Sequence, residues 1–253
     1  MLRVRDIALA YGKSEPVLEG VNLDVGPGEF VSLIGPSGSG KTSILRAVTG
    51  LQSVLSGSIH LDIPPRDVGF LFQDDALLPW RTARQNVALG LKIRGTDKAE
   101  AERTADEWLA MLGLEGLGDR FPRQLSGGQR KRVAIAQVLA LKPKLLLMDE
   151  PFASLDAIVR LRITQDLLSW VEREHMTVLL VTHDLEEAIA VSDKVYVLSQ
   201  GPRADIRARH TVPIPRPRDV LATRRHASFA PLLQTLWNEL AEESGSAMRR
   251  AAE

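Results

Sequence analysis

The sequence predicts an α/β protein whose core is a parallel β-sheet. Three short apolar runs, residues 30–34, 145–148 and 177–181, have the length and composition of buried strands. Each run ends in a glycine-rich or polar turn, and stretches compatible with helices follow the first run and separate the last two. Strands that alternate with helices in this way pair side by side in a parallel sheet.

Bulk composition narrows the functional classes. The chain has 253 residues, enough for one sizeable core or a core with an inserted subdomain. Its 32 Lys and Arg residues balance 32 Asp and Glu residues, which argues against a dedicated nucleic-acid binder. There is no cysteine, so disulfides, thiolate catalysis and cysteine-ligated zinc are excluded. No apolar run approaches the roughly 18 residues of a membrane span, and the first residues lack the apolar segment of a signal peptide. We therefore expect a soluble, cytoplasmic protein.

The N-terminal part is expected to be mostly β-structure. Residues 2–25 alternate between apolar and polar positions around a turn at 11–14, which is typical of edge strands. A helix is expected at 43–48, after the strand at 30–34. Short strands are expected at 58–61 and 68–72, on either side of a Pro64-Pro65 turn.

The remaining elements follow a change of character near residue 74. Residues 74–140 show helical periodicity and predict a mostly helical insertion. A helix near 161–174 and a strand at 195–198 complete the predicted core. Residues 201–225 contain seven arginines and four prolines, and we expect them to be irregular and solvated. An amphipathic helix is expected at about 229–242.

A phosphate-binding loop is the strongest motif. Residues 35–42 read Gly-Pro-Ser-Gly-Ser-Gly-Lys-Thr and match G-x-x-x-x-G-K-[ST] between a predicted strand and a predicted helix. Such a turn directs backbone N–H groups and the positive end of a helix dipole at one point. Lys41 is expected to contact the β- and γ-phosphates, and the Thr42 hydroxyl to bind Mg²⁺. The sequence therefore predicts a nucleoside-triphosphate site.

Two carboxylates follow the second buried strand. Asp149 and Glu150 stand at the carboxyl end of that strand, the edge where α/β sheets bind ligands. Asp149 is expected to hold Mg²⁺ through water, and Glu150 to polarise the attacking water. The alternative is that Asp149 caps the next helix.

His183 and Gln73 also follow predicted strands. His183 comes directly after the strand at 177–181 and its Thr182, so it can face the γ-phosphate or the attacking water. A single histidine at such a place is otherwise a turn or capping residue. Gln73, which follows the strand at 68–72, is unremarkable by itself.

A second anion-seeking helix start lies at residues 125–129, Leu-Ser-Gly-Gly-Gln. Ser126 is a good N-cap, and a helix-compatible run at 130–141 follows two glycines. Either this helix start converges with the phosphate loop in one molecule, or it serves the nucleotide of a neighbouring copy.

All these motifs, in this order, make the chain resemble the nucleotide-binding subunit of ATP-binding-cassette (ABC) transporters over roughly residues 1–200. The resemblance implies a P-loop NTPase with a RecA-like α/β core, an N-terminal antiparallel β-subdomain and an inserted helical subdomain that carries the signature. It implies an ATPase domain at 1–212, with the helical subdomain at about 74–140, and a C-terminal extension at 213–253. The loop 154–156 resembles the segment that contacts the partner across the dimer.

The resemblance also assigns roles to individual residues. It implies catalytic roles for Glu150, His183 and Gln73, and metal ligation by Thr42, Gln73 and Asp149. Tyr11 resembles the aromatic residue that stacks on adenine, although it could equally close the turn beside Gly12. The implied contacts to Mg²⁺ and ATP comprise Tyr11, Gly35, Pro36, Ser37, Gly38, Ser39, Gly40, Lys41, Thr42, Ser43, Gln73, Ser126, Gly127, Gly128, Gln129, Asp149, Glu150 and His183.

The partners are likewise implied by the resemblance. A head-to-tail homodimer would place Ser126 and Gly128 of one copy over the γ-phosphate that Lys41 of the other copy holds. A membrane permease, peripheral attachment to the inner membrane face and an indirect solute-binding protein would complete the system, with no nucleic acid. The segment 74–80 resembles that of nitrate, sulfonate and taurine importers. There Leu77, Leu78 and Trp80 could line a groove for a permease helix, or Trp80 could simply pack the helical subdomain.

One residue departs from the family pattern, and alternatives remain at this stage. Gln137 stands where the family usually carries an arginine. Besides an importer ATPase, the sequence allows an exporter subunit, a regulatory ATP switch or a nucleic-acid-associated cassette. The short separation of Lys41 and Ser126 leaves no room for the long coiled coil of chromosome-associated relatives.

Overall fold

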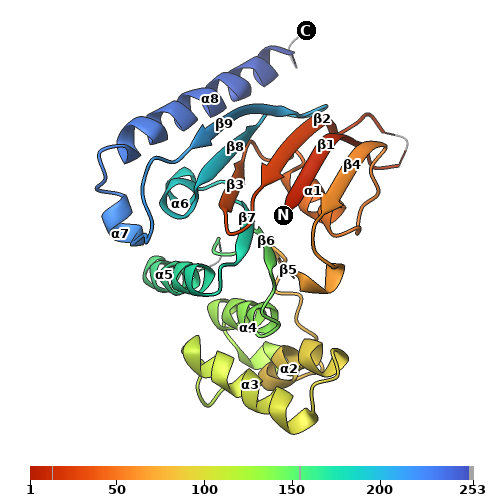
Figure 1. The fold of residues 1–253 in the computed structure, drawn as a ribbon, viewed down its shortest axis with the longest axis vertical. Helices are drawn as coiled ribbons and strands as arrows, with labels where there is room; N and C mark the ends of the chain where they lie inside the picture. The colour runs from red at the N-terminus through yellow and green to blue at the C-terminus, as the bar shows by residue number, and fades with distance from the viewer. Residues whose placement is uncertain (13, 154, 251–253) are drawn as a thin grey trace. The chain divides into compact units, whose positions relative to one another are not determined.

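The computed structural model describes residues 1–12, 14–153 and 155–250, with side chains up to residue 243 in the last helix. The chain forms two compact units (Figure 1). Unit 1 comprises Met1–Pro65 and Leu167–Glu253, and unit 2 comprises Arg66–Asp166.

Unit 1 begins with an antiparallel sheet in the order β2-β1-β4 (Figure 1, red and orange strands). Its strands are β1 (Leu2–Leu9), β2 (Leu18–Val25) and β4 (Ser56–Leu61). Buried and exposed positions alternate along β1 and β2, as expected for strands with one face on a core. The predicted N-terminal antiparallel β-structure is confirmed.

Parallel strands form the core of unit 1. Strand β3 (Phe30–Ile34) pairs in parallel with both β7 (Thr177–Val181) and β8 (Lys194–Leu198). Strands β3 and β7 are buried along their whole length, which explains why their sequences are apolar without alternation. The helices of this unit are α1 (Lys41–Val48), α6 (Leu185–Val191), α7 (Val220–Thr223) and α8 (Phe229–Arg250). The sequence analysis missed α6 and α7.

Unit 2 combines a strand pair with helices. Strands β5 (Val68–Leu71) and β6 (Leu145–Asp149) pair in parallel. Between them lie α2 (Ala83–Ile93), α3 (Lys98–Met111) and α4 (Gly127–Leu139), which pack on one another. Short 3₁₀ turns occur at Pro65–Asp67 and Pro122–Gln124. Helix α5 (Ala157–Arg173) begins in unit 2 and ends in unit 1.

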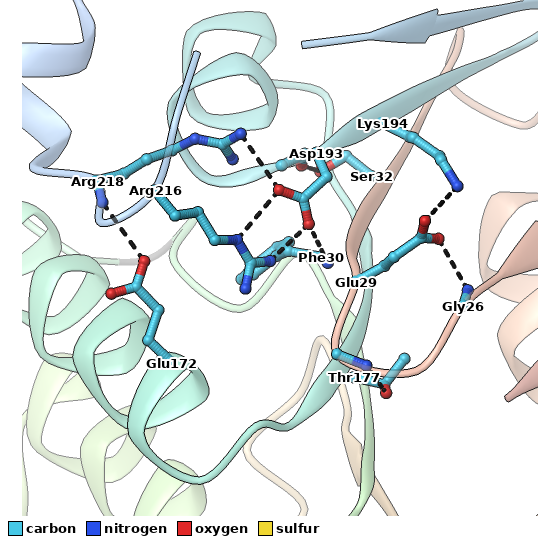
Figure 2. Close-up of polar contacts among 12 residues, drawn as sticks. Gly26, Glu29, Phe30, Ser32, Glu172, Thr177, Asp193, Lys194, Arg216 and Arg218 are labelled. Carbon is cyan, nitrogen blue, oxygen red and sulfur yellow. Dashed lines mark hydrogen bonds and ion pairs between the residues drawn. The ribbon is translucent and has the colours of Figure 1, made fainter. Parts of the chain in front are cut away.

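The expectation that the arginine- and proline-rich stretch is irregular and solvated is wrong in part, because the stretch contains a strand and a buried arginine. Residues Ile206–Thr211 form β9, which pairs antiparallel with β8. Further along, the guanidinium groups of Arg216 and Arg218 converge on the carboxylate of Asp193 (Figure 2). These contacts keep Arg218 almost completely buried, at 5% exposure. Local composition suggested solvation because it does not reveal the distant carboxylate with which both arginines pair.

Within the described parts of the chain, no helix combines the length and the apolar character that a bilayer span requires.

Candidate nucleotide site

The phosphate loop of unit 1 has the backbone geometry that its glycines require. Strand β3 ends at Ile34, and α1 begins at Lys41 after an N-cap at Gly40 in the left-handed conformation, with φ 93°. A Cβ atom on Gly40 would lie 2.7 Å from Cδ2 of Leu18, so any larger residue would clash. Gly38 also has a positive φ of 79°, and a Cβ there would meet no atom within 4 Å. The loop therefore curls tightly at its base while its tip has room for a ligand.

Lys41 holds its ammonium group inside this curl. The residue is 7% exposed, and its Nζ donates hydrogen bonds to the carbonyl oxygens of Gly35 at 2.8 Å and Pro36 at 2.7 Å. The positive charge is thereby placed beside the N-terminus of α1, whose first N–H groups have no partner within the helix. Both features attract anions, so the loop fits a polyphosphate.

The side chain of Tyr11 contacts the first turn of α1. Its hydroxyl and Ser43 Oγ are 2.7 Å apart, and the residue is 43% exposed. The structure therefore brings Tyr11 next to the phosphate loop, with part of its ring open to solvent. An aromatic face in such a place is a platform on which a nucleobase can stack. Lys13 lies outside the described residues.

His183 follows β7, the strand that pairs with β3, and β3 leads into the phosphate loop. Val181 of β7 pairs with Leu33 of β3, and the Thr182 backbone N–H donates to the Leu33 carbonyl at 3.3 Å. His183 is exposed, and the next residue, Asp184, caps α6 by accepting from the Glu187 N–H. The capping role that was the alternative for His183 therefore belongs to Asp184.

The two carboxylates of unit 2 stand at the end of β6. Asp149 is the last residue of that strand and is 3% exposed. Glu150 follows with φ 45°, a left-handed conformation that is uncommon for a residue with a side chain. Helix α5 begins only at Ala157, and Asp156 accepts a hydrogen bond from the Val159 N–H there. The alternative of Asp149 as the cap of the following helix is therefore wrong.

The signature segment, residues 125–129, opens α4 as predicted. Ser126 is the N-cap, and it forms a reciprocal capping box with Gln129: the Gln129 N–H donates to Ser126 Oγ at 3.2 Å, and Gln129 Oε1 accepts from the Ser126 N–H at 2.8 Å. Gly127 and Gly128 form the first turn. A Cβ on Gly128 would lie 3.6 Å from Leu155 Cδ2. Ser154, in the loop predicted to contact a partner, lies outside the described residues.

Gln73 is exposed, and its backbone carbonyl is bound by a lysine that the sequence analysis missed. Lys131, on α4, is 1% exposed and donates hydrogen bonds to the carbonyls of Phe72 at 2.9 Å and Gln73 at 2.8 Å. Burial lowers the pKa of Lys131, while Asp75, Asp74 and Asp149 oppose this effect. The available signal was a lysine at spacing i, i+4 and i+8 with Ile135 and Leu139, on the buried stripe of the helix.

The sequence profile of the ABC transporter family matches residues 18–153, which is more than half of the chain. The chain belongs to the ABC transporter family. The predicted P-loop ABC ATPase fold is confirmed, and so is the resemblance to the branch of nitrate and taurine importers.

Curated relatives support this placement. The taurine import ATP-binding protein TauB of Pseudomonas putida is 43% identical, over 80% of this chain and 79% of its own length. The sulfate/thiosulfate import protein CysA of a Synechocystis strain is 47% identical over 73% of this chain, and the nitrate import protein NrtC of Synechococcus elongatus is 41% identical over 89%. This ABC chain spans 54% of that CysA and 35% of that NrtC.

A solved structure agrees with the fold. A dimeric ATP-binding cassette in a post-hydrolysis state, bound to ADP and Pi, is 33% identical with a TM-score of 0.77. The match covers 85% of this chain and all of that cassette.

Proposed function

We propose that this ABC chain is the ATP-hydrolysing subunit of an importer and drives solute uptake through a separate permease. The observation that carries the proposal is the built phosphate loop, with Lys41 inside its curl, in a chain whose relatives are named import ATP-binding proteins. The exporter, regulatory and nucleic-acid-associated alternatives find no comparable support among these relatives.

The site residues divide the chemistry of hydrolysis among them. Lys41 and the N–H groups of α1 bind the phosphates, and the ring of Tyr11 stacks on the adenine base. Glu150 orients and polarises the attacking water, while His183 and Gln73 contact that water or the γ-phosphate. Positioning and electrostatics account for most of the barrier lowering in such phosphoryl transfers.

Magnesium fits the oxygen donors present. Thr42 supplies a hydroxyl at the second position of α1, Asp149 a buried carboxylate, and Gln73 an amide oxygen. Mg²⁺ prefers such oxygen ligands together with phosphate oxygens and water. The ion, when bound, neutralises charge that develops on the phosphates.

Two copies are proposed to act as a head-to-tail homodimer. Ser126 is occupied as a helix cap, but the N–H groups of Gly127 and Gly128 lie in the first turn of α4, where backbone N–H groups have no partner within the helix and can bind an anion. In the dimer this anion is the γ-phosphate that the partner copy binds. ATP then holds the copies together, and hydrolysis releases them.

A pocket in unit 2 is the proposed site for the permease. It has a volume of about 290 Å³ and is lined mainly by apolar residues of β5, α2 and α4, with Asp75 as a charged member. Gln137, the departure from the family pattern, is part of the lining. Leu77, Leu78 and Trp80, which the sequence analysis placed in such a groove, lie outside the described lining. Trp80 is 69% exposed, so it does not simply pack the helical subdomain.

The remaining parts of the proposal concern solute and location. The relatives' names specify sulfate or thiosulfate, nitrate, bicarbonate and taurine, so we propose a small solute with an oxyanionic group. The ATPase subunit would lie on the cytoplasmic face of the membrane, with a solute-binding protein on the other side. Residues 1–212 would form the ATPase domain, with a helical part at about 74–140, and 213–253 an extension.

The test is ATPase activity with and without the permease in proteoliposomes. Addition of permease and loaded binding protein should stimulate hydrolysis and drive uptake. Ile93→Glu, at an exposed position of the pocket lining, should abolish this stimulation but keep the basal rate. Ile158→Glu is the matched control, because Ile158 is equally exposed on α5 outside the pocket. Hydrolysis that never responds to any co-expressed permease would refute the importer assignment.

A further inference from the structure

A buried lysine lies on α4, the helix that begins at the signature, and it has no role in the proposed hydrolysis. Lys131 is 1% exposed and lies on the same stripe of α4 as Ile135 and Leu139. Lysine is almost never fully buried unless its ammonium group is paired, because burial without partners disfavours the charge. Lys131 therefore requires polar partners inside unit 2.

Its partners are backbone carbonyls of the segment that follows β5. The ammonium donates to Phe72 O at 2.9 Å and to Gln73 O at 2.8 Å. Strand β5 ends at Leu71, so these two carbonyls lie just beyond the strand. Charge-assisted bonds of this length are stronger than neutral ones. Lys131 therefore fixes the backbone of Gln73, while the Gln73 side chain stays exposed.

The neighbouring arginine adds a second attachment. Arg130 Nε lies 3.3 Å from Asp75 Oδ2, and its Nη1 donates to the carbonyl of Leu125 at 2.9 Å, the residue just before the signature serine. Two consecutive cations of α4 thus hold the segment 72–75, and one of them also holds the start of the signature.

We propose that Lys131 is a positioning residue, which keeps Gln73 in fixed register with the signature helix, so that Gln73 reaches the nucleotide of its own copy while the signature reaches the nucleotide of the partner copy. The inference rests on the proposed ATPase function. The segment 72–75 and α4 then move as one body, because a shift of either would break bonds between a buried cation and two carbonyls. Gln73 contributes to hydrolysis only while this register holds.

The test uses four variants in the full chain, two at Lys131, one control on α4 and Gln73→Ala. Lys131→Met keeps much of the side-chain volume and removes both bonds. Lys131→Gln is the conservative variant, since one amide NH₂ can donate to two carbonyls. Arg132→Met is the matched control: Arg132 is the next residue of α4 and also donates to backbone carbonyls, those of Leu112, Gly113 and, at 3.4 Å, Gly128, but not to the Gln73 segment.

Two measurements separate positioning from general destabilisation. In Lys131→Met, kcat for ATP should fall about 10-fold or more with KM changed less than about 3-fold, because the phosphate loop is untouched. Lys131→Gln should recover most of that loss. Hydrogen exchange of the amides at 70–76 should quicken in Lys131→Met and stay at the wild-type rate in Arg132→Met.

Each outcome decides the proposal. Unchanged kcat in Lys131→Met, no recovery in Lys131→Gln, or an equal loss in Arg132→Met would each overturn it. So would unchanged exchange at 70–76 in Lys131→Met. If the wild-type chain hydrolyses no ATP, the proposed function fails instead, and the exchange comparison alone then decides whether Lys131 holds the segment. Gln73→Ala should reproduce the loss of kcat without faster exchange.

Discussion

Removal of the Asp193 carboxylate should destabilise unit 1 more than any exposed ion pair does. Asp193 precedes β8, and one of its oxygens accepts from the Phe30 N–H at 2.9 Å, where β3 begins (Figure 2). The same carboxylate accepts from Arg216 at 3.1 and 2.5 Å and from Arg218 at 3.2 Å. Asp193→Ala therefore loses one bond to the strand that leads into the phosphate loop and leaves two guanidinium groups without this acceptor.

The size of the effect follows from burial. Breaking a buried charge pair by removing one partner costs about 3–5 kcal/mol. The side chain of Arg218 is 2% exposed, but those of Asp193 and Arg216 are 27% and 31% exposed, and Arg218 keeps its bonds to the Ile214 carbonyl. The lower end of the range applies, about 3 kcal/mol. For a chain of this size, each kcal/mol shifts the melting temperature by about 2–4 °C, so Tm should fall by about 6–12 °C.

Thermal unfolding of Asp193→Ala beside Asp62→Ala measures this effect. Asp62 is the matched control, since its carboxylate also has several polar partners, the N-terminus, Arg3 and His60, but its side chain is 45% exposed. Its removal should change Tm far less, because solvent screens exposed pairs. Equal Tm values for the two variants, or a wild-type Tm for Asp193→Ala, would refute the reasoning from burial.

Three further predictions concern the nucleotide site. Glu150→Gln should bind ATP normally while kcat falls by about 10²–10⁴-fold, because an amide cannot take a proton from water, and sedimentation with Mg·ATP should then show a trapped dimer; normal turnover would contradict the base assignment. Lys41→Ala should weaken ATP binding on the order of 100-fold, because the charge inside the loop is lost, and calorimetry showing unchanged affinity would exclude that role. Ser126→Asp should keep the cap and the Tm but prevent ATP-induced dimerisation through charge repulsion, whereas Ser126→Ala should lose about 1 kcal/mol of stability; dimerisation of Ser126→Asp as in wild type would argue against a phosphate contact.

Local sequence was sufficient where the determining interactions are local. The phosphate loop could be predicted because its backbone conformation requires glycine, as the φ of 93° at Gly40 shows. The cap at Ser126 could be predicted because it bonds to a residue only three positions away. Strands such as β3 and β7 were found at their observed bounds, since burial on both faces leaves an unbroken apolar run.

Long-range pairing was the part that only the tertiary structure decided. Nothing near Arg218 in the chain announces that Asp193 neutralises it, and nothing near Lys131 announces the carbonyls of Phe72 and Gln73. A charged side chain looks alike in sequence whether water or a distant oxygen satisfies it. The sequence therefore determined the phosphate loop, the cap of the signature helix and the buried strands, while folding decided which charges are buried and what they hold in place.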